Sequence, residues 1–292
     1  MSAATDAAAP PKVRPFYWSV RRELWENRAL WMAPLVVQAV VLLAFFVASF
    51  RLPDMVAAAR TGQQLALPYS AAAAAAFFVS FIVVVFYALG ALNGERRDRS
   101  LLFWKSLPVS DTTTVLAKAA IPLAVQPAIA LVIAVASQVV MLVWGSFVML
   151  VSGNDPSEYW RYLHLPLMWA MLPYGLVMNA LWDVPFYGWL LLVSAWAKRA
   201  TFVWAVGPWL AAMLFEFLVF RTRRVAELVG ERVFGGFDRA YTVTGQENVA
   251  VTSLAQVDPM RFIGDPGFWG GLVVGAACLA ACVWLRRRHE PL

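Results

Sequence analysis

The charged stretch NGERRDRSLLFWKSLPVSDTTTVLAK, residues 93–118, separates two uncharged apolar runs at residues 71–92 and 121–151. The first part of this stretch is charged, positions 101–104 are all apolar, and Pro108 follows. Ser110 or Asp111 is then suited to cap a helix that begins at Thr112. The pattern predicts a connector between two helices, with an apolar tip in its middle.

The composition around this connector is that of an integral membrane protein. Of the 292 residues, 61% are hydrophobic and 14% are charged, whereas soluble domains contain about 25% charged residues. The mean hydropathy is +0.64. The 24 Lys and Arg against 18 Asp and Glu do not imply nucleic acid, because cytoplasmic loops of membrane proteins are rich in basic residues. We therefore expect an all-α polytopic membrane protein with no nucleic-acid partner.

Six apolar runs are long enough to cross a hydrocarbon core of about 30 Å. The predicted spans are, approximately, residues 30–50, 71–92, 121–151, 170–197, 201–220 and 267–285. Residues 1–13 are predicted to be a disordered tail, and residues 14–292 a single transmembrane domain. Residues 51–69 are predicted to form a loop. Proline is expected to kink the third run at Pro122 and Pro127, and the fourth is expected to break at Pro173, Asp183 and Pro185.

Residues 15–28 form an amphipathic segment ahead of the first span. Helical spacing places Val20, Leu24 and Trp25 on one face, and the charged side chains of Arg21, Arg22, Glu23 and Glu26 are expected to face away from it. Such a helix is typical of the membrane interface. The alternative is packing against another cytosolic subunit.

An even number of crossings places both termini on one side of the membrane. Most of the 24 basic residues lie in segments that share this side, and basic residues favour the cytoplasm. We therefore expect cytoplasmic termini, a cytoplasmic connector and an extracytoplasmic segment at residues 221–266. Within that segment, helical spacing relates Val225, Leu228, Val229 and Val233.

Motifs for independent chemistry are absent from the sequence. It contains no GxxxxGK[ST] phosphate loop, no G-x-S-x-G elbow and no H-E-x-x-H helix. Its only histidines are His164 and His289, and Cys278 and Cys282 are interpreted as small packing residues on one face of the last span. We therefore expect no enzymatic activity, cofactor or metal in this chain alone.

The apolar tip of the connector has two interpretations. An exposed apolar patch usually marks a protein interface, but these side chains would also suit lipid headgroups, where Trp is common. The basic cluster, the Glu95 to Arg99 spacing that supports a helical turn and the Pro108 turn favour a protein partner.

The connector resembles that between the second and third spans of bacterial ABC-transporter permeases of the type 2 exporter class. The match is specific over about residues 95–118, and the six-span plan, the N-terminal interfacial helix and the long segment before the last span are similar. The resemblance implies a cytosolic coupling helix that docks on a separate ATPase subunit. The residues given this role are Glu95, Arg96, Arg97, Arg99, Leu101, Leu102, Phe103, Trp104 and Lys105.

The same resemblance implies a second permease copy, with a homodimer expected, in the inner membrane of a bacterial cell surrounded by its lipids. ATP and Mg²⁺ would be bound by the ATPase partner. The expected function is the membrane subunit of an exporter for an amphipathic or hydrophobic substrate such as a drug, antibiotic, peptide or lipid. The alternatives are a membrane scaffold or sensor whose connector binds another protein and, less favoured, an integral membrane enzyme.

Two acidic residues fall within apolar runs, where ionisable groups are costly and often functional. Glu216 and Asp183 are candidates for lining a translocation path. The alternatives are a headgroup-level Glu216 beside Arg221 or Arg223, and an Asp183 that caps a re-formed helix. Gly267, Gly271 and Gly275 recur every four residues in the last span and are expected to allow close helix packing.

Overall fold

The computed structural model describes residues 14–58, 63–97, 109–241 and 257–288. Within these ranges the regular structure is helical, apart from one isolated antiparallel bridge between Tyr241 and Val257. The elements before the connector are α1 (Pro15–Glu26), α2 (Ala29–Ala48), η1 (Ser49–Arg51), α3 (Leu52–Ala58), α4 (Gln63–Ala91) and α5 (Asn93–Arg97).

The second half of the described chain follows the connector. Its first elements are α7 (Asp111–Ala120), η2 (Ile121–Val125), α8 (Gln126–Val151), α9 (Pro156–Leu163), α10 (Leu165–Trp182) and α11 (Val184–Trp196). Its last elements are α12 (Thr201–Phe220), α13 (Arg224–Phe234), α14 (Gly236–Ala240), α15 (Pro259–Ile263) and α16 (Pro266–Arg288).

Six helical segments among the described residues are long and apolar enough to cross a membrane. They are Ala29–Ala58, Gln64–Glu95, Asp111–Val151, Pro156–Trp182, Thr201–Phe220 and Pro266–Arg288. The prediction of an all-α chain with six long apolar helices is confirmed. The shorter apolar helix α11 lies between the fourth and fifth of these segments.

The fourth apolar run differs in detail from its prediction. It divides at Asp183 into α10 and α11, and α10 continues through Pro173 without a break. A proline inside a helix is tolerated where neighbouring helices surround the freed carbonyl. Pro185 lies in the first turn of α11, where proline has no helical hydrogen bond to lose.

The third apolar run is continuous with α7 but contains an irregular turn. The Ser110 side chain caps α7 by accepting a hydrogen bond from the Thr113 amide at 3.1 Å, as predicted for this position. The five residues of η2 form a π-helical turn that includes Pro122. The expected irregularity at this proline therefore takes the form of a local π-bulge, a feature common at functional sites.

The loop predicted at residues 51–69 is helical over most of its length. Pro53 lies in the first turn of α3, and α4 begins at Gln63 and continues through Pro68. The loop prediction was wrong because Pro53 lies in the first turn of a helix, where proline removes no helical hydrogen bond, and Pro68 is tolerated inside α4 beside neighbouring helices. The helical spacing predicted for Val225 and Val233 is confirmed by α13.

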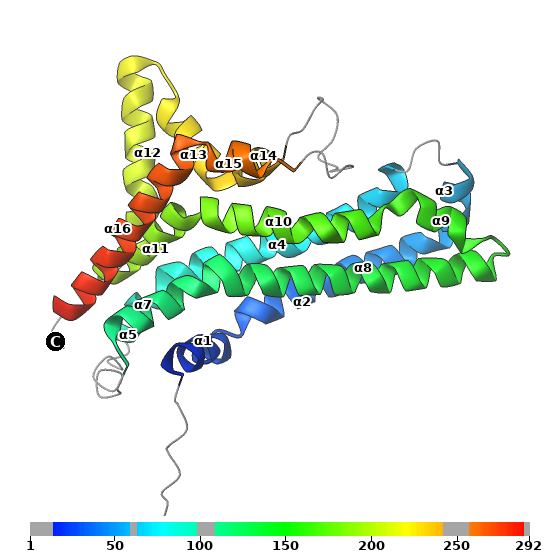
Figure 1. Cartoon of the computed structure of the whole chain (residues 1–292), viewed down its shortest axis with the longest axis horizontal. Coiled ribbons are helices and arrows are strands. Elements are labelled where there is room, and N and C mark those ends of the chain that lie inside the picture. The colour runs from blue at the N-terminus through cyan, green and yellow to red at the C-terminus, as the bar shows by residue number, and fades with distance from the viewer. Residues whose placement is uncertain (1–13, 59–62, 98–108, 242–256, 289–292) are drawn as a thin grey trace, which may run out of the picture.

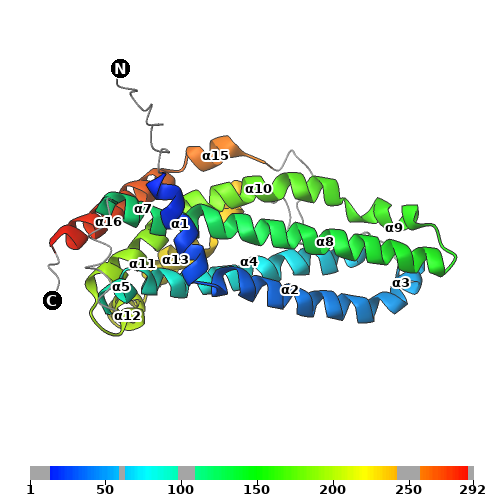
Figure 2. The ribbon, with the colours of Figure 1, turned by 90° about the horizontal axis from the view of Figure 1, so that it is seen from below.

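The longest helices form an elongated bundle. Figure 1 shows α2, α4, α8 and α10 running side by side along the long axis, with α12 and α16 at one end. The starts of α2 and α7, the end of α4 and the C-terminal end of α16 gather at this end, and Figure 2 shows α1 lying across it. The connector ends and α1 are therefore neighbours of the C-terminal helix.

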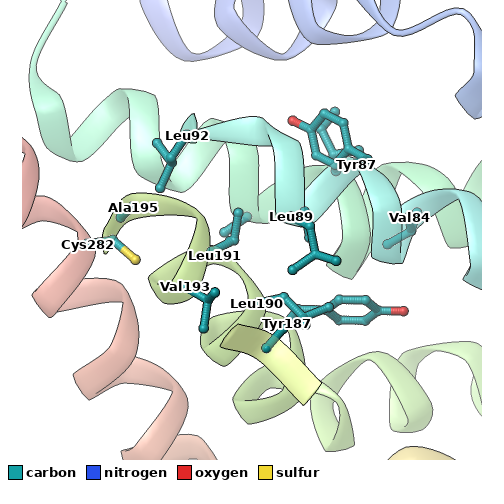
Figure 3. Packing of buried hydrophobic residues seen from close by; sticks show 14 of the residues in the cluster. Val84, Tyr87, Leu89, Leu92, Tyr187, Leu190, Leu191, Val193, Ala195 and Cys282 are labelled. Atoms are coloured by element: carbon teal, nitrogen blue, oxygen red, sulfur yellow. The ribbon is translucent and has the colours of Figure 1, made fainter. Parts of the chain in front are cut away.

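The largest apolar core cluster joins α4, α11 and α16 at this end. Figure 3 shows Leu89 of α4 and Leu92, which follows the end of α4, beside Leu191 of α11, with Cys282 of α16 at the edge. Cys282 is fully buried. This apolar packing fixes the positions of the charged side chains that border it.

Candidate functional site

The most deeply buried charged residue of α1 is Glu23, which is 2% exposed. The expectation that Glu23 faces away from the apolar face of α1 was wrong: Glu23 is buried on the side where Val20 and Leu24 pack against the core, whereas Trp25, assigned to the apolar face, is 63% exposed. Helical periodicity could not identify which charged residue has a buried partner. The partner explains the orientation.

That partner is Lys118 of α7. Its Nζ lies 2.8 Å from Glu23 Oε1 and 3.1 Å from Glu95 Oε1, and the side chains of both Lys118 and Glu23 are 3% exposed. The Tyr87 hydroxyl donates a hydrogen bond of 2.8 Å to the second oxygen of Glu23. One lysine thus joins α1, α5 and α7.

The second half of this arrangement is built around Arg286 of α16. Its Nη1 lies 2.5 Å from Glu95 Oε2, and its Nε lies 2.8 Å from Asp111 Oδ1. Within the connector, Glu95 stands just before residues 98–108 and Asp111 just after them. A single guanidinium therefore pairs with carboxylates on both sides of residues 98–108.

Arg22 of α1 closes the network. Its Nη2 lies 3.0 Å from Glu23 Oε1 and 3.2 Å from Glu95 Oε1, and its Nε lies 3.5 Å from Glu26 Oε1. We call the complete set the ion-pair cluster, which comprises Arg22, Glu23, Glu26, Tyr87, Glu95, Asp111, Lys118 and Arg286.

The electrostatics of α1 reflect this enclosure. Burial acts to lower the pKa of Arg22, but Glu23, Glu26 and Glu95 together raise it above its ordinary value. Burial also raises the pKa of Glu26, and Arg22 opposes that rise. Because buried charges are stable only when they are paired, loss of one member leaves its neighbours uncompensated.

The end of α11 is attached to the same region. The backbone amides of Leu92 and Asn93 both donate to Ser194 Oγ, at 3.0 Å and 3.1 Å. The contact fixes the boundary between α4 and α5, two residues before Glu95. The segments predicted to share the N-terminal side of the membrane thus meet at one end of the molecule.

The docking residues predicted in the connector lie mostly outside the described part of the chain. Glu95 is in the ion-pair cluster, and the backbones of Arg96 and Arg97 lie in α5. Outside the described residues are Arg99, Leu101, Leu102, Phe103, Trp104 and Lys105. The apolar tip therefore stays a prediction, whereas α5 before it and α7 after it are observed.

Glu216 organises the start of α13. Its carboxylate accepts hydrogen bonds from the Thr222 hydroxyl at 2.6 Å, the Arg224 amide at 2.9 Å and the Val225 amide at 2.7 Å. These amides belong to the first turn of α13, where a helix has unpaired donors and favours a negative charge. The geometry gives Glu216 a capping contact with α13.

Asp183 lies between α10 and α11 and is 3% exposed. It was expected as an alternative to cap α11, but its side chain makes no capping bond. Instead, Asn179 Nδ2 donates to Asp183 Oδ2 at 2.7 Å. Asp183 lines an internal cavity of about 220 Å³, and Glu216 is not among the lining residues.

The glycines of α16 face different neighbours. A Cβ at Gly275 would lie 3.0 Å from the Val184 carbonyl carbon of α11, and one at Gly188 would lie 3.2 Å from the Gly275 carbonyl oxygen. A Cβ at Gly271 would collide with the Arg232 guanidinium, and one at Gly267 would lie 2.9 Å from Asp265 Oδ1. The close approach of helix backbones involves Gly275.

The sequence reasoning missed Tyr87, Lys118 and Arg286 as members of a site. Lys118 and Arg286 flank apolar runs, where basic residues also serve as membrane-boundary charges. A usable signal was the presence of Glu23, Glu95 and Asp111 beside apolar runs, since buried carboxylates require cationic partners.

Comparison of the sequence with protein-family models finds no match. Comparisons with curated proteins and with solved structures likewise give no significant match.

Proposed function

We propose that the chain is the membrane-spanning permease subunit of an ATP-driven exporter. In this proposal a separate cytosolic ATPase docks on the connector, and its ATP-driven closure is coupled to translocation of an amphipathic or hydrophobic substrate. The membrane is the inner membrane of a bacterial cell, with both termini in the cytoplasm. ATP and Mg²⁺ bind to the partner and not to this chain.

The observation that supports the proposal most directly is the pairing of Arg286 with Glu95 and Asp111. A coupling element must transmit displacement from its docking surface to the spans. Because Glu95 and Lys118 also pair with α1, movement of residues 98–108 would be passed to α1, α4, α7 and α16 together. A connector serving only as a turn would not need these buried charges.

The packing of α12 is compatible with a second permease copy. Only 6% of the most apolar part of α12 is buried by the rest of the protein, against 44% for the segment that contains α4. Lipid would cover such a surface in a monomer. In the proposed complex, a second copy of this chain covers part of it.

The docking step is tested by co-purification with the expected ATPase subunit. Its gene is sought as a neighbouring reading frame with a phosphate-binding loop. Phe103→Asp and Trp104→Asp are expected to abolish the complex and its coupled ATPase activity. Phe50→Asp, at an exposed position outside the connector, serves as the control for an added charge. The proposal is overturned if both connector variants retain full binding and coupling.

The coupling step requires a different variant. Glu95→Gln keeps the side-chain shape but removes the charge that pairs with Lys118 and Arg286. It is expected to preserve ATPase binding while lowering substrate-stimulated ATP hydrolysis and transport. A connector that instead recruits a protein without ATPase activity would favour the scaffold or sensor function.

A further inference from the structure

A cavity of about 220 Å³ lies between α4, η2, α10, α11 and the end of α13, apart from the ion-pair cluster. Its wall is largely apolar and includes the aromatic rings of Phe77, Phe81 and Tyr187. The π-helical turn η2 contributes Pro122 to it, and Gln126 follows from the first residue of α8. Residues from six separate elements, α4, η2, α8, α10, α11 and α13, thus surround one space.

Three buried oxygen atoms on this wall lack a hydrogen-bond partner within the described part of the chain. They are Ser80 Oγ, Gln126 Oε1 and Asp183 Oδ1. Their residues are 4%, 1% and 3% exposed. Buried polar atoms are normally paired, because leaving one unsatisfied is costly. Three such atoms on a single cavity therefore indicate that an occupant supplies the missing hydrogen bonds.

The side chains of Gln126 and Asp183 are each fixed by a hydrogen bond that leaves one oxygen unused. Gln126 Nε2 donates to the Leu30 carbonyl at 2.8 Å, which leaves Oε1 as the unused end of the amide. Asn179 donates to Asp183 Oδ2 at 2.7 Å, which leaves Oδ1 unused. Binding of a ligand would therefore not require rearrangement of either group.

Asp183 is the only acidic residue among the described residues that line the wall. Among the described residues no cation forms an ion pair with it within 4.0 Å. The neighbouring Arg232 donates instead to the Gly267 carbonyl at 2.7 Å and lies 4.1 Å above the Trp182 ring. Arg232 is thus near enough to interact electrostatically with Asp183 but forms no ion pair with it.

We propose that this cavity binds an organic cation consisting of a protonated amine on an apolar body. The ammonium group donates hydrogen bonds to Asp183, Gln126 and Ser80, and the aromatic wall covers the body and favours the positive charge. An anion would be repelled by Asp183, and an apolar molecule would leave all three oxygens unpaired. A Ca²⁺ ion would need 6–8 oxygen ligands.

The size of the space limits the ligand. An apolar cavity of about 150 Å³ accommodates benzene, so the present volume suits one ring with a short aminoalkyl chain. That this cation is the exported cargo rests on the proposed function. The binding site itself does not, because every contact in it comes from this chain.

Binding is tested by ¹⁹F NMR with the full chain in phosphatidylcholine nanodiscs, without an ATPase. The probe is 2-(4-fluorophenyl)ethylamine, compared with the neutral 2-(4-fluorophenyl)ethanol and the anionic 4-fluorophenylacetate. The amine is expected to bind most tightly. Asp183→Asn should weaken amine binding by about thirtyfold or more, since it removes one partner of a buried charge pair, and should leave alcohol binding nearly unchanged.

A second variant tests the site independently of Asp183→Asn, which could fail to fold. Ser80→Ala should weaken the amine while preserving the protein's unfolding temperature, because Ser80 Oγ has no partner to lose among the described residues, and Asp155→Asn, at an exposed helix cap outside the cavity, should change nothing. Equal affinities for amine and alcohol would overturn the proposal, as would amine binding that Asp183→Asn does not weaken. Either result would mean that the cavity does not recognise a positive charge through Asp183.

Two sources of the ammonium group are distinguished by adding phosphatidylethanolamine to the nanodiscs. Competition with the probe identifies a lipid headgroup as the occupant, and unchanged probe binding identifies a free amine. If the amine binds but no ATPase partner is found, the transport function fails while the binding site stands.

Discussion

Glu95 and Arg286 are 191 residues apart in sequence and only 2.5 Å apart in space, measured between Oε2 and Nη1. The contact joins α5, at the start of the connector, to the last turns of α16. Arg286 also pairs with Asp111, which follows residues 98–108. This arrangement attaches the described residues on both sides of residues 98–108 to α16.

The two adjacent arginines of α16 provide a matched test of this role. Arg286 is buried and paired, whereas Arg287 is exposed. Arg286→Gln is expected to destabilise the protein by about 3 kcal/mol, because it leaves Asp111 unpaired and removes one of the three cations around Glu95. Arg287→Gln should change stability by about 0.5 kcal/mol or less. Thermal unfolding in one detergent would compare them, and equal effects would contradict the importance of the pair.

The Glu23 to Lys118 pair should behave as a coupled unit. Lys118→Met leaves Glu23 and Glu95 without their shared cation and is expected to cost about 3–5 kcal/mol. Adding Glu23→Gln should recover part of that loss, because one buried negative charge is removed as well. A double-mutant cycle of unfolding free energies measures the coupling. Strict additivity would mean that the two residues do not interact.

The cap on α13 should depend on Glu216. Glu216→Ala removes the acceptor of the Arg224 and Val225 amides, so these amides should exchange hydrogen faster in deuterated buffer. Glu227→Ala, at an exposed position in the same helix, is the control and should leave both rates unchanged. Unaltered protection in Glu216→Ala would show that α13 is held by other contacts.

The contact between α11 and α16 should be sensitive to a single methyl group at Gly275. A Cβ there meets the backbone of Val184 and Pro185, so Gly275→Ala is expected to cost about 1–3 kcal/mol through overpacking. Gly270→Ala has no neighbour within 4 Å and should be neutral or slightly stabilising. The two unfolding temperatures decide between these outcomes.

The orientation of the chain is accessible to cysteine labelling in intact cells, in a background with Cys278 and Cys282 replaced by alanine. Asn154→Cys, in the exposed turn between α8 and α9, should react with a membrane-impermeant maleimide. Arg287→Cys should react only after the cells are opened. The reverse pattern would invert the proposed topology and place the connector outside.

The sequence by itself determined the helical, membrane-spanning character of the chain and much of its local detail. Six long apolar helices follow from composition and length, because unpaired backbone groups are excluded from hydrocarbon. The Ser110 cap and the helical spacing of α13 were equally readable, since both depend on residues within a few positions of one another.

Only the tertiary structure decided which charges are buried and what they pair with. Glu23 faces inward because Lys118 stands opposite it, and the oxygens of Ser80, Gln126 and Asp183 share one cavity because α4, α8 and the junction of α10 with α11 converge there. These relationships depend on packing between segments far apart in sequence. Local periodicity contains no information about which helices become neighbours, so it could not assign them.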